Sequence, residues 1–195
     1  GKKFSWENVL YYTLMRDAIV MDKFRFNNQD SILYNNVKSL VVAPQNKQKA
    51  FVYGLSSTFL YKPDAHFTLK GNFNYTFGRI KTDTNDYALD HVSPITGSLF
   101  LNYAVNKFST DFYVLFNGWK KLKNYNLLGE DNQQYATVDG MPAWFTLNLR
   151  AQYALCNYAT LQAGIENILD TQYRTFASGI NAPGRNLYVT FRLFY

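Results

Sequence analysis

Residues 186–195 read NLYVTFRLFY, and apolar side chains occupy every second position of this stretch. They are Leu187, Val189, Phe191, Leu193 and Tyr195. The intervening set is Asn186, Tyr188, Thr190 and Arg192, and only Phe194 breaks its polar character. Because successive side chains of a strand point to opposite faces, this period of two predicts a β-strand with one apolar face. The Pro183-Gly184 step just before it is typical of a turn.

The same alternation recurs upstream in further runs. Apolar residues take alternate positions in residues 53–59, 67–77, 99–105, 145–155 and 161–166, while 108–119 is a mixed aromatic run. Residues 4–14 and 18–24 are two weaker candidates. Several runs exceed ten residues, more than the ~5–6 of a typical soluble strand. A tilted strand needs ~9–11 residues to cross a bilayer, so the lengths favour transmembrane strands.

The connections between these runs are of two kinds. Residues 61–65, 104–107 and 155–158 are tight turns, whereas 27–49, 81–94, 120–142 and 170–184 are long and polar. Short and long connections alternate strictly along the chain. This order is expected of an antiparallel up-and-down meander with tight turns at one end and extended loops at the other. The sequence therefore predicts an all-β fold of the transmembrane β-barrel type.

Composition narrows the class of protein. Aromatic residues make up 18% of the chain and charged residues 17%, which excludes a disordered chain. The single cysteine, Cys156, excludes a small domain held by disulfides, and no apolar run is long enough for a spanning helix. The charges that give a net +6 are scattered. Lys120, Lys121 and Lys123 come nearest to a cluster, which we expect to be a solvated rim, and no nucleic-acid partner is expected.

No residue pattern indicates catalysis. The two histidines, His66 and His91, lie in different connections, so no catalytic or metal-binding pair is indicated. Asp83, Asp86 and Asp90 offer oxygen ligands for Ca²⁺, but the glycine and the bidentate Glu of a calcium loop are missing, which favours a solvated loop. The sequence thus predicts that the protein is not an enzyme and has no catalytic residues, no cofactor and no metal site.

Two motifs near the C-terminal end carry a family resemblance. The segment GIENILDTQYR (164–174) resembles the penultimate-strand motif of the TonB-dependent outer-membrane receptor family, and Asn167, Asp170 and Tyr173 are the matching positions. Pro183, Gly184 and Arg185 resemble the family's step into the last strand. The alternation of Leu187, Val189, Phe191, Leu193 and Tyr195 resembles the signal that the barrel-assembly machinery recognises, although Phe or Trp is more usual than Tyr at the last position. The resemblance is specific over the last thirty residues and generic before them.

The resemblance implies a barrel of about 22 strands that a separate N-terminal plug domain fills. This chain holds only about nine or ten candidate strands. We therefore expect residues 1–195 to be the C-terminal portion of such a barrel, with the plug domain absent. An incomplete barrel exposes sheet edges and an apolar face. We expect it to close abnormally, to pair with another copy, or to lie in a larger complex.

The implied function is TonB-dependent uptake of a scarce nutrient across the outer membrane of a Gram-negative bacterium. In this family the nutrient is an iron-siderophore, haem, cobalamin or a glycan, and the sequence does not choose among them. The implied partners are outer-membrane lipid, the barrel-assembly machinery, a small nutrient ligand, and the TonB complex through the missing N-terminal part. Ligand-binding residues are not assigned, although Trp119, Lys121, Arg174 and Arg185 are of types that contact anionic ligands.

Two other readings of the pattern remain open. One is a complete outer-membrane barrel of about eight to ten strands with a structural or adhesive role. The other is a soluble β-barrel that carries an apolar ligand, in which the apolar face points inward. The direction of that face therefore separates the soluble barrel from the membrane barrel.

Overall fold

The computed structural model describes residues 3–81, 86–126 and 128–194. Eight antiparallel strands form its main sheet, in chain order without a crossover. They are β1 (Phe4–Lys23), β4 (Val42–Tyr61), β5 (Phe67–Lys81), β7 (Thr96–Val105), β8 (Phe108–Asn117), β11 (Trp144–Cys156), β12 (Ala159–Glu166) and β13 (Asn186–Leu193). A short ninth strand, β6 (Asp86–Ala88), adds to the end of β5. The prediction of an all-β antiparallel meander is confirmed.

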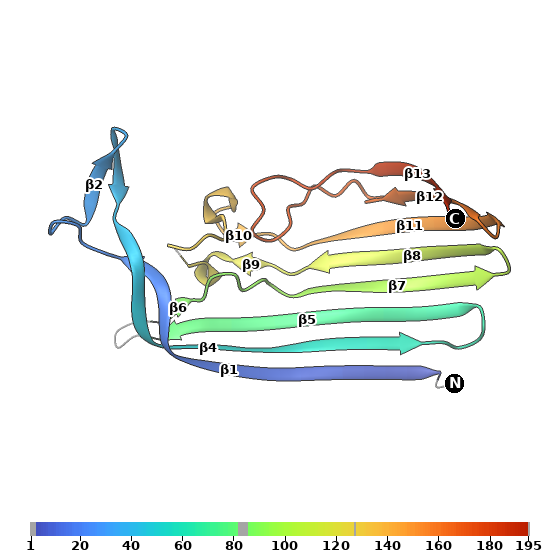
Figure 1. Cartoon of the computed structure of the whole chain (residues 1–195), viewed down its shortest axis with the longest axis horizontal. Helices are drawn as coiled ribbons and strands as arrows, with labels where there is room; N and C mark the ends of the chain where they lie inside the picture. The colour runs from blue at the N-terminus through green and yellow to red at the C-terminus, as the bar shows by residue number, and fades with distance from the viewer. Residues whose placement is uncertain (1–2, 82–85, 127, 195) are drawn as a thin grey trace.

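Smaller elements lie within the connections. In the connection from β1 to β4, a hairpin of β2 (Ser31–Tyr34) and β3 (Val37–Leu40) projects away from the sheet (Figure 1). A second pair, β9 (Lys120–Lys121) and β10 (Gly140–Met141), lies between β8 and β11. Two single-turn 3-10 helices, Leu122–Asn124 and Gln133–Tyr135, lie in the same connection. Among the described residues, no helix has both the length and the apolar character required to cross a membrane.

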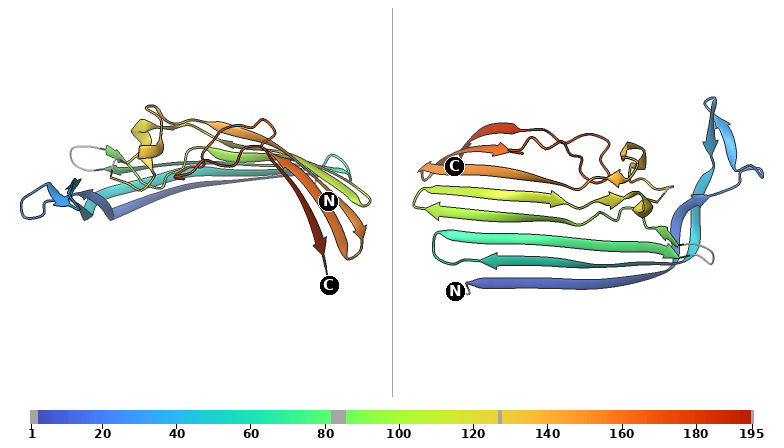
Figure 2. Two further views of the ribbon diagram at one scale, coloured as in Figure 1. Left: turned by 90° about the horizontal axis from the view of Figure 1, so that it is seen from above. Right: turned by 180° about the vertical axis from the view of Figure 1, so that it is seen from behind.

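The sheet is curved but does not close (Figure 2). Strands β1 and β13 form its two edges, and in the described parts of the chain neither pairs with the other. Of the three expected outcomes for an incomplete barrel, abnormal closure is therefore wrong, and pairing with another copy or a place in a larger complex stay predictions. A complete small barrel has no such edges, so the open sheet supports part of a larger barrel.

Tight turns and long connections segregate to opposite ends of the sheet. The turns of residues 62–66, 106–107 and 157–158 lie at the end where both termini lie (Figure 1). The described parts of the long connections, residues 24–41, 86–95, 118–126, 128–143 and 167–185, lie at the other end. The alternation predicted from the sequence is therefore confirmed, and it gathers polar loops at one rim of the sheet.

One face of the sheet is apolar across its full width. Register pairing links one residue from each of the eight strands into a single row on this face: Phe4, Tyr61, Leu69, Leu101, Phe112, Leu149, Ile165 and Leu187. The row is open to the surroundings, and Leu187 is 75% exposed. The apolar residues of β13 therefore do not pack into a core, which argues against a soluble barrel with an inward apolar face.

The opposite face carries a hydrogen-bonded polar network. Arg150 pairs with Asp111 at 2.6 Å, and the amide of Asn102 donates to the same carboxylate at 2.9 Å. Nearer the long connections, Asn72 donates to the hydroxyl of Ser98 at 2.6 Å. Such satisfied polar groups suit a face that lines an aqueous or protein-filled interior.

The first hairpin differs from the sequence prediction. Residues 4–14 and 18–24 form one continuous strand, and the predicted loop 27–49 is wrong because β4 already begins at Val42. Strand β1 pairs with β4 from Phe4 opposite Tyr61 to Lys23 opposite Val42. The outer part of β4 includes Asn46 and Lys49 and lacks an apolar face. Without a face to bury, a strand shows no alternation, and the sequence pattern cannot reveal it.

Candidate functional site

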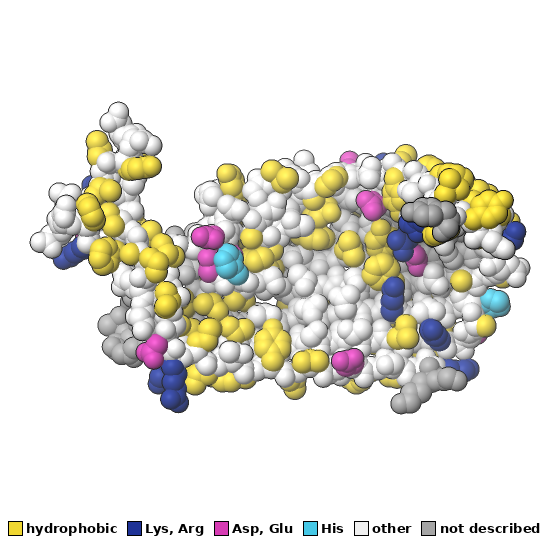
Figure 3. Space-filling model, viewed as in Figure 1, with side chains coloured by type: hydrophobic (Ala, Val, Ile, Leu, Met, Phe, Trp, Pro, Cys, Tyr) yellow, Lys and Arg dark blue, Asp and Glu magenta, His cyan; other side chains and the backbone are white. Residues whose placement is uncertain are grey.

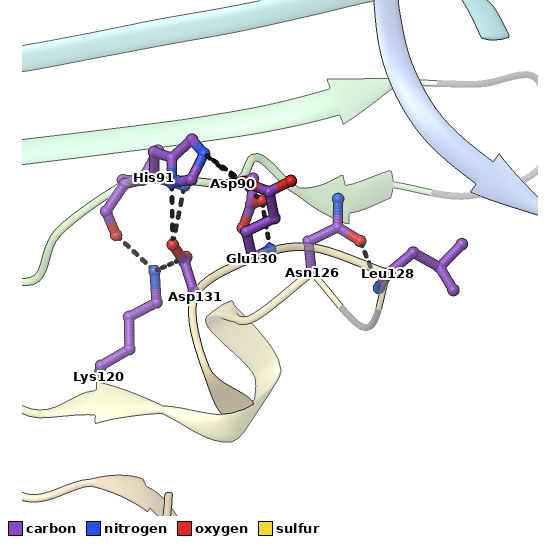
Figure 4. A network of polar contacts seen from close by, with 8 residues as sticks. Asp90, His91, Lys120, Asn126, Leu128, Glu130 and Asp131 are labelled. Carbon is purple, nitrogen blue, oxygen red and sulfur yellow. Dashed lines mark hydrogen bonds and ion pairs between the residues drawn. The ribbon is translucent and has the colours of Figure 1, made fainter. Parts of the chain in front are cut away.

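The long-connection rim is where polar side chains from distant parts of the sequence meet. Because β5, β7, β8, β11, β12 and β13 are successive neighbours, the connections 82–95, 118–143 and 167–185 lie next to one another. A histidine and acidic side chains lie side by side at this end in the space-filling view (Figure 3). Figure 4 shows the same residues from close by, and they come from two connections.

Lys120 is at the centre of this rim. Its side chain is only 3% exposed, and its ammonium group donates to the carbonyl of Val92 and lies 3.4 Å from Asp131 Oδ2. It also lies 4.6 Å from the centre of the Phe176 ring, in a cation–π contact. The predicted solvated rim is therefore wrong for Lys120, although Lys121 and Lys123 are exposed. The reason is that β9 turns this one side chain toward the neighbouring connection.

The Lys120–Asp131 pair is deeply buried. Burial lowers the pKa of Lys120 and raises the pKa of Asp131, because both lose the solvation of their charged forms. The attraction between the two groups opposes both shifts. A buried pair of this kind costs solvation free energy, so each partner depends on the other.

His91 brings three acidic side chains together. Its Nδ1 lies 3.4 Å from Asp131 Oδ1, and its Nε2 lies 3.9 Å from both Asp90 Oδ2 and Glu130 Oε2. The backbone N–H of His91 also donates to Asp131 Oδ1, and that of Glu130 donates to Asp90 Oδ2. We name Asp90, His91, Lys120, Glu130 and Asp131 the rim cluster. It joins connection 82–95 to connection 118–143 through charged contacts.

Among the described residues, the group of potential metal ligands that includes Asp90 does not include Asp86. Asp83 lies outside the described residues, and Asp86 lies in β6. Asp90 instead meets His91 and Asp131, and one ligand atom from each lies within 4.8 Å of the others. No local pattern could have revealed this group, since Asp131 is about forty residues from its partners.

A second set of contacts ties connection 118–143 to connection 167–185. The amide of Asn132 donates to the carbonyl of Ala177 at 2.7 Å, and Arg174 donates to the carbonyl of Tyr135 at 2.9 Å. Arg174 is also held by Asn181 at 2.8 Å. The three connections therefore form one linked rim.

The six family-motif residues come together in the connection between β12 and β13. Asn167, only 3% exposed, donates through Nδ2 to the carbonyls of Thr171 and Pro183, and its Oδ1 accepts from the Thr171 N–H. The carboxylate of Asp170 accepts from the Arg185 N–H at 2.7 Å, and the Arg185 side chain donates to the carbonyl of Ile168. We call residues 167–185 the motif turn.

Packing completes the motif turn. A Cβ on Gly184 would lie 2.6 Å from Asp170 Oδ1, so any larger residue would displace that carboxylate. The Tyr173 ring packs on Trp144 with 4.2 Å between ring centres. Asn167 and Asp170 adopt positive φ angles, which Asn and Asp tolerate better than most residues. The pattern thus marks a turn that directs the chain from β12 into β13.

The other sequence-based candidates are dispersed. Trp119 lines a pocket of about 450 Å³ with Arg79 and Lys123, and Arg174 lines one of about 210 Å³ with Tyr135 and Trp144. Lys121 and Arg185 line neither pocket. Leu187, Val189, Phe191 and Leu193 of the expected assembly signal lie exposed on edge strand β13, and Tyr195 lies outside the described residues. Their recognition by the assembly machinery stays a prediction.

Comparisons with known proteins agree with this architecture. The copper transporter OprC superposes with a TM-score of 0.76 and 17% identity, covering 99% of this chain and 29% of that one. A mutant of the ferric enterobactin receptor PfeA from Pseudomonas aeruginosa, solved with enterobactin, superposes with a TM-score of 0.69 and 18% identity. The match covers 99% of this chain and 29% of that one. The FrpB iron transporter from Neisseria meningitidis superposes with a TM-score of 0.69 and 9% identity, and the match covers 97% of this chain and 29% of that one.

These likenesses show the shared fold, and the chain spans about 29% of the length of each of those three proteins. A search of curated proteins found no match. The family model described as "TonB dependent receptor-like, beta-barrel" matches residues 1–168. The chain therefore belongs to the TonB-dependent receptor β-barrel family, whose members lie in the outer membrane of Gram-negative bacteria.

Proposed function

We propose that this chain is the C-terminal portion of the barrel of an outer-membrane receptor that takes up a scarce nutrient with energy from TonB. The family match over residues 1–168 is the observation that carries the proposal. In this proposal the plug domain and the segment that contacts TonB belong to a part of the protein upstream of residue 1. The unpaired edges of β1 and β13 are then the positions at which the rest of the barrel joins.

The two faces of the sheet support this assignment. The apolar row that crosses all eight strands suits contact with outer-membrane lipid. The polar face with the Arg150–Asp111 pair suits the interior. The linked rim of long connections supplies a surface for capture of a small ligand, and the neighbouring structures include receptors of siderophores and metal ions. We propose transport rather than catalysis on these grounds.

Growth under nutrient limitation tests the proposal. A strain that lacks the protein is supplied with an iron-siderophore, haem, cobalamin or a glycan as the sole source of the limiting nutrient. We expect a growth defect with one of these sources, and the same defect in a strain that carries the protein but lacks TonB. Uptake that persists without TonB contradicts the proposal.

Charge substitution tests the orientation of the sheet. Leu149→Arg places a charge on the apolar face, and we expect it to lower the unfolding free energy by about 2–4 kcal/mol when the site lies in the bilayer. Gln152→Arg, on the polar face of the same strand, is the matched control. Unfolding by denaturant in lipid vesicles measures both variants. Equal effects of the two substitutions would contradict a lipid-facing row.

A further inference from the structure

The rim cluster holds more negative than positive charge. Asp90, Glu130 and Asp131 face a single ammonium group, that of Lys120, and the imidazole of His91 lies between them. Asp90 Oδ1 is buried, and within the described residues it has no hydrogen-bond partner. Buried carboxylate oxygens are normally paired or coordinated to a metal ion. The cluster therefore carries an excess of negative charge, which a bound cation would offset.

The donor atoms are spaced for a single small cation. One ligand atom from each of Asp90, His91 and Asp131 lies within 4.8 Å of the others. A Zn²⁺ ion holds nitrogen and oxygen ligands at about 2.0–2.2 Å, so its ligands lie roughly 3–4 Å from one another. His91 faces Asp131 with Nδ1 and Asp90 with Nε2, so binding of one ion requires side-chain rotations that bring a single nitrogen toward both carboxylates. The His91 side chain is 67% exposed, which leaves an entry path from solvent.

Neighbouring groups already orient the carboxylates. Lys120 holds Asp131 Oδ2, which leaves Asp131 Oδ1 facing the imidazole. The backbone N–H of Glu130 holds Asp90 Oδ2 at 2.7 Å. Contacts of this kind from groups around a metal ion fix the direction of its ligands. Lys120 thus acts as a positioning residue for the site.

The mixture of donors selects the class of ion. Ca²⁺ takes six to eight oxygen ligands, and Mg²⁺ retains waters, so an imidazole donor suits neither. One imidazole with two carboxylates suits Zn²⁺ and similar transition-metal ions. We propose that Asp90, His91 and Asp131 bind one divalent transition-metal ion that ties connection 82–95 to connection 118–143. This site links two loops and goes beyond the proposed uptake function.

A metal titration with matched variants tests this site. The intact protein that contains this chain is purified in detergent, stripped with a chelator, and titrated with Zn²⁺ in a calorimeter. His91→Gln and Asp90→Asn remove one ligand each and leave the buried Lys120–Asp131 pair intact, so the loops stay folded. We expect the wild type to bind one Zn²⁺ more than His91→Gln, or to bind it about 100-fold more tightly. His66→Gln, at the tight-turn end, is the control and is expected to bind as the wild type.

Two further readouts keep the test independent of transport. Co²⁺ in the wild type is expected to give visible absorption bands that His91→Gln lacks. Bound Zn²⁺ is expected to slow hydrogen exchange in residues 89–93 and 128–133 of the wild type alone. The same Zn²⁺ stoichiometry and affinity in the wild type, His91→Gln and Asp90→Asn would overturn the proposal, and so would a loss of binding in His66→Gln.

Discussion

The motif turn and the rim cluster lie at the same end of the sheet, yet they are held together differently. In the motif turn, Asn167, Asp170 and Arg185 bond mainly to backbone groups within the same nineteen-residue connection. In the rim cluster, side chains from two connections meet through ionic contacts, with Asp131 forty residues from His91. Local bonds to the backbone specify a turn geometry, whereas ionic contacts between loops specify only that the loops meet. The motif turn therefore has a fixed backbone geometry, whereas the contacts of the rim cluster depend on the charge state of its side chains and so on pH and salt.

The largest expected effect comes from breaking the buried pair of the rim cluster. Lys120→Met leaves Asp131 as a buried carboxylate without its cation, and loss of one partner of a buried pair costs about 3–5 kcal/mol. We expect the loops to separate locally, which hydrogen exchange of residues 89–93 and 118–135 measures. Lys121→Met, at the exposed neighbouring position, is the control. Unchanged exchange in Lys120→Met would mean that the pair does not hold the loops.

A smaller effect is expected from the motif turn. Asn167→Ala removes three side-chain hydrogen bonds and leaves two part-buried carbonyls without this donor, so we expect a loss of about 2 kcal/mol. The midpoint of unfolding in urea measures it. Asn186→Ala, an exposed position in β13, should stay within about 0.5 kcal/mol. If both variants unfold at the same midpoint, the motif residues do not stabilise the turn.

A double variant tests whether the rim cluster needs its ionic contact or only buried side chains of similar size. Lys120→Met with Asp131→Leu replaces the buried pair by apolar side chains, and such replacements are often neutral or stabilising. We expect the double variant to recover most of the order lost in Lys120→Met, to within about 1 kcal/mol. Hydrogen exchange of the same residues measures the recovery. A double variant as disordered as the single one would show that the ionic contact itself is required.

The smallest expected effect is that of pH on the stability that Asp131 contributes to the folded loop. Burial raises its pKa on folding, so the folded loop binds a proton more readily than the unfolded chain. The stability contributed by this group is therefore highest below the unfolded pKa of about 3.9 and falls as pH rises toward the folded pKa. Hydrogen exchange of the rim, followed as pH rises from the unfolded pKa toward the folded pKa, measures the change. Asp131→Asn should lack it.

The sequence by itself determined the strands that have an apolar face and the order of short and long connections, and the family resemblance singled out the residues of the motif turn. Each of these rests on residues close in the chain: alternation needs neighbours at two-residue spacing, and Asn167 bonds within four residues of itself at Thr171. The same logic explains why the outer part of β4, residues 42–50, was missed, since it has no apolar face.

Only the tertiary structure decided the rim cluster and the burial of Lys120. Lys120, His91 and Asp131 meet because β5, β7, β8 and β11 are neighbours, which places the connections they carry side by side. A run of three lysines in four positions is ordinary surface sequence, and nothing local shows which one turns inward. Charges separated by a long connection interact only after the backbone has brought them within a few ångströms, because water and salt screen them at larger distances.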